Sequence, residues 1–83
     1  MFNIVEAMHR DAINLAPNVR AIDKLEVECM GNTPESSLLR SFDLPKAKVY
    51  SAFNNANNIM FMCGSYQCPN NPQNGVIWML TSE

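Results

Sequence analysis

The sequence is short of charge and has no segment apolar enough to cross a membrane. Charged residues make up 17% of its 83 residues, six basic against eight acidic, and neither sign is clustered. This balance excludes the basic surface with which proteins contact nucleic acids or anionic membranes. The longest apolar runs, 59–63 and 76–80, are far below the about 20 residues of a membrane-spanning helix. The N-terminus has no basic stretch followed by an apolar one. We therefore expect a soluble protein that is not exported.

The cysteines and the single histidine are poorly spaced for chemistry. Cys29, Cys63 and Cys68 contain no C-x-x-C pair, and His9 is the single histidine. An odd number of cysteines builds neither a complete disulfide framework nor a four-cysteine zinc site. Pairing of Cys63 with Cys68, or a metal site with His9, stays open, but the spacing favours free thiols in a reducing compartment. We name no catalytic, cofactor-binding or metal-binding residue.

The chain length is that of one small domain, residues 1–83. A chain of this size buries only about 60–65% of the surface that its unfolded form exposes. Its core is therefore marginal, and a partner that covers further apolar surface would add to its stability.

The first 31 residues predict one strand and one long helix. Apolar residues within 3–8 indicate a short strand. A helical turn at 11–16 then leads into an amphipathic helix with Pro17 in its first turn and Gly31 at its end. Intervals of three and four place the apolar face of this helix at Leu15, Val19, Ile22, Leu25 and Cys29. Asp23 and Glu26 would be exposed charges.

The rest of the chain predicts a second helix and three strands. Thr33-Pro34-Glu35 is a helix start, and Leu38, Leu39 and Phe42 form the apolar side of the helix that follows. From 47 onward the apolar period is two, which indicates a hairpin around the asparagine-rich turn 54–58. Gly64 indicates a bulge or a close backbone approach. A loop at 68–75, with Pro69 and Pro72, then precedes the last strand.

The last strand, 76–80, is the most informative feature of the sequence. Each of its residues, Val76, Ile77, Trp78, Met79 and Leu80, is apolar, which is typical of a strand covered on both faces. The given chain ends at Glu83 with no further element to cover it. We therefore expect these five residues to form an interface with another chain or a second copy. Trp78 is either the anchor of this contact or a residue packed on the long helix.

This order of elements predicts an α+β fold in which two helices pack on a mainly antiparallel four-stranded sheet. The patterns that carry a family resemblance span nearly the whole chain: Asp11-Ala12 before Leu15-Ala16-Pro17-Asn18-Val19-Arg20, Asp23 and Glu26, Thr33-Pro34-Glu35 before Leu38-Leu39-Arg40-Ser41, Ile59-Met60-Phe61-Met62-Cys63-Gly64, and Gly75-Val76-Ile77-Trp78-Met79-Leu80. The order resembles the N-terminal half of the Gcn5-related N-acetyltransferase (GNAT) fold. More closely, the sequence is similar to a bacteriophage family of acetyltransferase-like proteins, typified by a T7-like internal virion or scaffold-associated protein.

The resemblance implies a protein of the virion or the host cytoplasm, with virion or assembly proteins or a second copy as partners. Acetyltransferases of this fold bind acetyl-coenzyme A beside the fourth strand, with the pyrophosphate on a glycine-containing turn that opens a helix. The chain contains no Q/R-x-x-G-x-G/A sequence, so this half of the fold is missing. We therefore expect a non-enzymatic virion structural or assembly component without a cofactor. The alternatives are an N-terminal fragment of a complete N-acetyltransferase and a module that binds a host protein.

Overall fold

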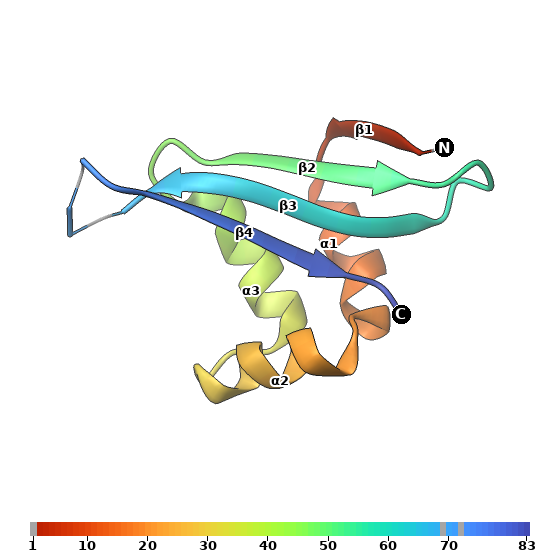
Figure 1. Ribbon diagram of the computed structural model, residues 1–83, viewed down its shortest axis with the longest axis horizontal. Helices are drawn as coiled ribbons and strands as arrows, with labels where there is room; N and C mark the ends of the chain where they lie inside the picture. The colour runs from red at the N-terminus through yellow and green to blue at the C-terminus, as the bar shows by residue number, and fades with distance from the viewer. Residues whose placement is uncertain (1, 69, 72) are drawn as a thin grey trace.

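All helices of the fold lie on one side of an antiparallel sheet (Figure 1). The computed structural model describes residues 2–68, 70–71 and 73–83. The elements, in chain order, are β1 (Asn3–Glu6), α1 (His9–Leu15), the 3-10 turn η1 (Ala16–Asn18), α2 (Ala21–Cys29), α3 (Pro34–Arg40), the 3-10 turn η2 (Ser41–Asp43), β2 (Lys48–Phe53), β3 (Ile59–Gln67) and β4 (Gly75–Thr81). The predicted α+β class and four-stranded antiparallel sheet are confirmed.

The sheet has the strand order β1-β2-β3-β4, and each strand runs antiparallel to its neighbours. The predicted hairpin between β2 and β3 is confirmed. Its turn is closed by the Asn54 side-chain oxygen, which accepts the N–H groups of Ala56 at 2.9 Å and Asn58 at 3.0 Å. Asn57 takes the positive φ of 62°, a conformation that asparagine tolerates better than most residues. The connection from β3 to β4 contains Pro69 and Pro72, which lie outside the described residues.

Gly64 in β3 marks a close approach, as one of its two predicted roles required. A Cβ added there would lie 2.5 Å from the carbonyl oxygen of Lys48 and 2.9 Å from the Trp78 ring. The irregularity in the β2–β3 register falls elsewhere, between Ala52 and Phe53.

The long helix predicted around Pro17 is in fact two helices, so the described chain has three α-helices rather than two. Pro17 belongs to η1, which separates α1 from α2. Proline lacks the N–H that a continuous helix needs, and the chain becomes extended at Val19 and Arg20 before α2 begins. The predicted end and restart are confirmed: Gly31 has φ 82°, and the Thr33 hydroxyl accepts the N–H of Ser36 at 3.1 Å.

The predicted apolar face of α2 is wrong. Ile22 and Leu25 are each 62% exposed, and Cys29 is exposed as well. The buried residues of α2 are Asp23 and Val27, which lie four positions apart on one side of the helix. The prediction of an exposed charge is therefore wrong for Asp23, whereas Glu26 is exposed as expected.

The core lies between the helices and the sheet, and residues of both contribute to it. Its buried apolar residues are Ala12, Leu15, Val19, Val27, Leu38, Met62 and Leu80. Leu39 and Phe42, predicted on the apolar side of the second helix, pack against this cluster, as do Val49 and Trp78. Only one face of the sheet takes part in this core, because all the helices lie on that side (Figure 1).

Candidate functional site

The other face of the sheet carries no helix (Figure 1). Apolar side chains occupy much of it, together with some polar ones. Side chains along a strand point alternately to the two faces. Ser51, Met62 and Leu80 are buried on the helix side, so their strand neighbours point the other way. We call the apolar side chains of this second side the open face; they are Ile4, Tyr50, Ala52, Phe61, Cys63, Ile77 and Met79, and Ala52 among them is fully buried. The same side also carries Glu6, Lys48, Ser65 and Thr81.

The register places these side chains next to one another across all four strands. One row runs from Ile4 through Ala52 to Phe61. The next row runs from Tyr50 through Cys63 to Met79. Directly opposite residues on one face are in contact distance, so the two rows form one patch across the middle of the sheet. The patch has a polar border: the first row ends at Thr81, the second begins at Glu6, and Ile77 lies opposite Ser65.

Several members of the open face are strongly exposed. Ile77 is 86% exposed, and Ile4 and Met79 are each 56% exposed. The ring of Phe2 extends the patch by packing edge-to-face on Phe61, with 5.6 Å between the ring centroids. An antiparallel sheet with one face in water normally carries polar residues there. Exposed apolar patches occur at protein or membrane interaction sites, at ligand-binding grooves and at surfaces prone to aggregation.

The five residues predicted at an interface divide between the two faces. Ile77 and Met79 belong to the open face. Trp78 packs against the core, and Leu80 is part of it. The structure thus places Trp78 in the second of its two predicted positions, although its indole N–H is buried without a hydrogen-bond partner among the described residues.

Within the sheet β4 pairs only with β3, and just beyond its end the chain forms an antiparallel bridge between Ser82 and Val19 on the other edge. In an antiparallel strand the N–H and C=O of one residue point to the same edge, and successive residues alternate. Ser82 donates to the Met60 carbonyl at 2.8 Å and so faces β3. Thr81, and with it Met79, Ile77 and Gly75, faces outward. Within the part of the chain that the structure describes, the outward N–H and C=O groups of Gly75, Ile77 and Met79 form no hydrogen bond.

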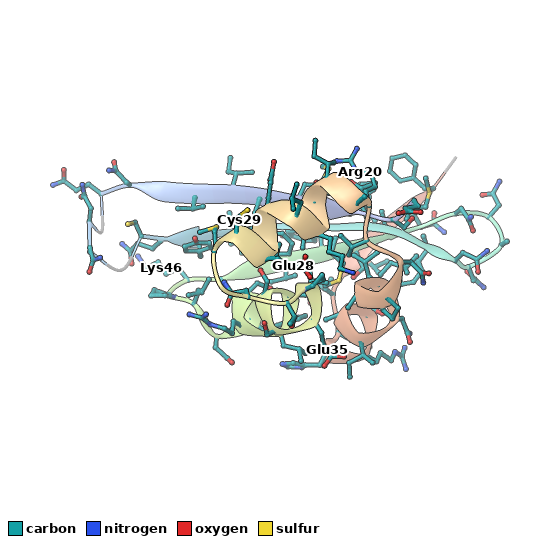
Figure 2. All side chains as sticks on the ribbon, turned by 90° about the horizontal axis from the view of Figure 1, so that it is seen from below. Arg20, Glu28, Cys29, Glu35 and Lys46 are labelled. Carbon is teal, nitrogen blue, oxygen red and sulfur yellow. The ribbon has the colours of Figure 1, made fainter. Side chains whose placement is uncertain are left out.

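The C-terminal end of this edge is closed by the start of α2. The Thr81 N–H donates to the Asp23 carboxylate at 3.0 Å, and the Thr81 carbonyl accepts the Arg20 N–H at 2.8 Å. We call Arg20, Asp23 and Thr81 the edge clamp. Figure 2 shows α2 from the helix side, with Arg20 at one end and Cys29 at the other. The free part of the edge is therefore Gly75 to Met79.

The charges of the edge clamp stabilise each other. The Arg20 guanidinium donates to both carboxylate oxygens of Asp23, at 3.1 and 3.2 Å. This side-chain hydrogen bond holds the pKa of Asp23 below its ordinary value, and the Thr81 N–H and the charge of Arg20 act in the same direction against burial. The same pair raises the pKa of Arg20. Because its carboxylate is hydrogen-bonded in this way, Asp23 is buried without being left uncompensated.

A second buried carboxylate joins α1 to the sheet. Asp11 accepts the Ser51 hydroxyl at 3.0 Å and the backbone N–H of Met8 at 2.9 Å. The first contact connects α1 with β2, and the second closes the N-terminus of α1. These partners account for the burial of Asp11, so the contact is structural. His9 is exposed and stacks on Phe42, with 4.3 Å between the ring centroids.

Two hollows flank the helix side of the sheet. A groove of about 600 Å³ lies between α2, α3 and β4, with Val27, Met30, Leu38 and Trp78 among its lining residues. A more polar hollow of about 820 Å³ lies where the β2–β3 turn approaches η1, and five asparagines line it: Asn14, Asn18, Asn54, Asn57 and Asn58.

The chemistry-bearing side chains do not gather at either hollow. The three cysteines are free thiols. Among the residues that the structure describes, no three His, Cys, Asp or Glu side chains lie close enough together to hold a metal ion, and no helix is both long and apolar enough to cross a membrane. No family model, curated protein or solved structure matches the chain.

Proposed function

We propose that this protein is a structural or assembly component that binds other protein chains through the open face. The observation that carries this function is the contiguous apolar patch on the side of the sheet that no helix covers, with Ile77 86% and Met79 56% exposed. Such a patch lowers its free energy by being removed from water.

The free energies of burial and of association indicate how large a partner surface is needed. Burying one large apolar side chain contributes about 1.5–3 kcal/mol, whereas association costs about 4–15 kcal/mol in lost freedom. A contact with Ile77 and Met79 alone therefore falls short of stable binding. A partner that also covers Tyr50, Cys63 and Ile4 raises the gain to at most about 7–15 kcal/mol, which is comparable with the cost. We therefore expect a flat partner surface that spans several strands.

We further propose, on the sequence resemblance described above, that the chains bound are those of a bacteriophage particle or of its assembly intermediates. The resemblance rests on the motifs of the sequence. The 83-residue chain lacks the glycine-containing turn with which acetyltransferases hold acetyl-coenzyme A. We therefore propose a non-enzymatic role.

A charge on the open face tests this function. Tyr50→Lys introduces an ammonium group on the open face, between Cys63 and Glu6, and Ile22→Lys introduces the same group on the exposed side of α2. Particles are purified by density gradient from cells that supply each variant, and the chain is quantified in them. We expect Ile22→Lys to enter particles as wild type does and Tyr50→Lys to be depleted at least about tenfold, the effect of about 1.4 kcal/mol.

Equal incorporation of the two variants would contradict the proposal. Thermal unfolding with and without acetyl-coenzyme A distinguishes the fragment alternative, because a ligand that binds the folded state raises the unfolding midpoint.

A further inference from the structure

The free edge of β4 has none of the features that usually protect an edge strand. Charged residues, proline, bulges and short length keep natural edges from pairing with other chains. β4 has seven residues, contains neither charge nor proline, and keeps a regular register with β3. The opposite edge, β1, has four residues and ends in Glu6. The two edges of the sheet thus differ, and only β4 offers an unprotected strand.

We propose that the free edge of β4 pairs antiparallel with β4 of a second copy, about a two-fold axis at Ile77. This pairing builds on the function proposed above, because it names the partner for one part of the surface. The copies would exchange backbone hydrogen bonds between the two Ile77 residues and between Gly75 of each copy and Met79 of the other.

The edge clamp determines this register. An axis at Met79 would place Ile77 opposite Thr81 of the second copy, whose outward N–H and C=O are already bound to Asp23 and Arg20. An axis at Gly75 would pair the strand with the connection before it. Only the axis at Ile77 uses the three outward-facing residues Gly75, Ile77 and Met79 of both copies and leaves the clamp intact.

The side chains fit the same register. On the open face the long Met79 would lie beside Gly75 of the second copy, which leaves it room. On the helix side Val76 would lie opposite Trp78. A two-fold axis brings a residue at the axis next to its own copy, so a neutral strand avoids like-charge repulsion at the centre of the contact.

The pairing would join two four-stranded sheets edge to edge, with both helix layers on one side. The two open faces would then form one continuous apolar surface. A dimer of this kind offers a larger flat surface to a further chain than one copy does, which is what the magnitudes given above require of a stable complex.

Amide hydrogen exchange tests the pairing, with a control inside the strand. At concentrations where sedimentation shows a dimer, we expect slow exchange at Ile77 and Met79 and fast exchange at both after dilution. Thr81 should exchange slowly in both states because its N–H donates to Asp23. A chain that stays monomeric, or a dimer in which Ile77 and Met79 exchange at the unprotected rate, would overturn the proposal.

Variants of Ile77 test the backbone and the axis. The Ile77 N–H faces away from β3, so Ile77→Pro removes an edge donor without breaking the internal ladder. We expect it to raise the dimer dissociation constant at least about tenfold over the matched Ile77→Ala, which keeps the donor. Ile77→Lys and Ile77→Glu should each be monomeric and should associate when mixed, since Ile77 meets itself. Equal dimerisation of the Pro and Ala variants, or a mixture that stays monomeric, would contradict the axis.

Tyr50→Lys separates the edge from the open face. Tyr50 lies on β2, two strands from the free edge, so the variant should dimerise as wild type does. Loss of the dimer in Tyr50→Lys would mean that the copies stack through their open faces, which overturns the edge pairing and leaves the function of the open face standing.

Discussion

The indole ring of Trp78 lies directly against the backbone of Gly64, on the neighbouring strand, so closely that a Cβ at position 64 would come within 2.9 Å of the ring. The same Cβ would lie 2.5 Å from the Lys48 carbonyl oxygen of the next strand. Glycine is therefore the residue that lets three strands stay in register while a tryptophan fills the helix side of the sheet.

Gly64→Ala should destabilise the protein by about 1–3 kcal/mol, the usual cost of forcing a methyl group into a packed region. The backbone oxygen of Lys48 does not have the freedom of a flexible side chain to move away. Gly75→Ala is the matched control, because a Cβ there meets its nearest atom at 3.6 Å, an ordinary contact. Urea unfolding of both variants gives the two free energies, and similar values would contradict the close approach.

Trp78→Ala should lower the free energy of unfolding by about 2–4 kcal/mol, as expected for an aromatic residue packed on the core. Ile77→Ala, one residue away on the open face, should change it by less than about 0.5 kcal/mol at concentrations where the chain is monomeric. Denaturant titrations followed by circular dichroism measure both. A larger loss for Ile77→Ala would reverse the assignment of the two faces.

Asp23 should make the free energy of unfolding depend on pH. Its pKa is lowered in the folded state, so its ionised form adds stability above about pH 4, the ordinary value for aspartate, and this contribution is lost as the pH falls through the lower folded pKa. Asp23→Asn should remove this contribution of Asp23 to the pH dependence of the unfolding free energy. Unfolding free energies of the two proteins between pH 6 and strongly acidic conditions, about pH 2, should converge toward the acid end. A difference that stays constant would contradict the ionic role of Asp23.

Ser51→Ala should cost about 1 kcal/mol, because Asp11 loses one buried donor and keeps the Met8 N–H. Asp11→Ala should cost more, about 2 kcal/mol, since it leaves both the Ser51 hydroxyl and the Met8 N–H without an acceptor. The double variant should fall short of the sum by about 1 kcal/mol if the two side chains interact directly. Additive losses would show that the contact between α1 and β2 contributes nothing of its own.

Local signals predicted the elements of this fold well. Thr33 and Gly31 mark the boundaries of helices through their own hydroxyl group and positive φ, and Asn54 closes the hairpin through its own side chain. Each of these signals works within a few residues. The four strands and the antiparallel sheet were also predicted, but not the order of the strands within it.

The rotation of α2 could not be predicted in the same way. The apolar periodicity favoured Ile22, Leu25 and Cys29 as the inward side, but the helix is turned so that Asp23 reaches the N–H of Thr81. That partner lies 58 positions along the chain, and nothing in the sequence near Asp23 indicates it. A tertiary hydrogen bond overrides the local pattern here.

Only part of the open face could be predicted from the sequence. The alternation within 59–63 is apolar in both phases, so it does not show which phase points away from the helices. Ile4, Tyr50 and Phe61 become neighbours of the last strand only through the register of the sheet. The unbroken apolar run 76–80 did indicate that one face needs cover, and Ile77 and Met79 are the residues of that run that lack it.

The thiol of Cys63 provides the most direct test that the open face is the binding surface. Cys63 lies in the middle of the patch, and Cys29 lies on the exposed side of α2 as a control in the same chain. Alkylation is followed at each cysteine by peptide mass spectrometry, in the dilute isolated chain and in purified particles. We expect both thiols to react in the isolated chain, and Cys63 alone to be protected in particles. A Cys63 that reacts in particles as fast as in the isolated chain would contradict the account.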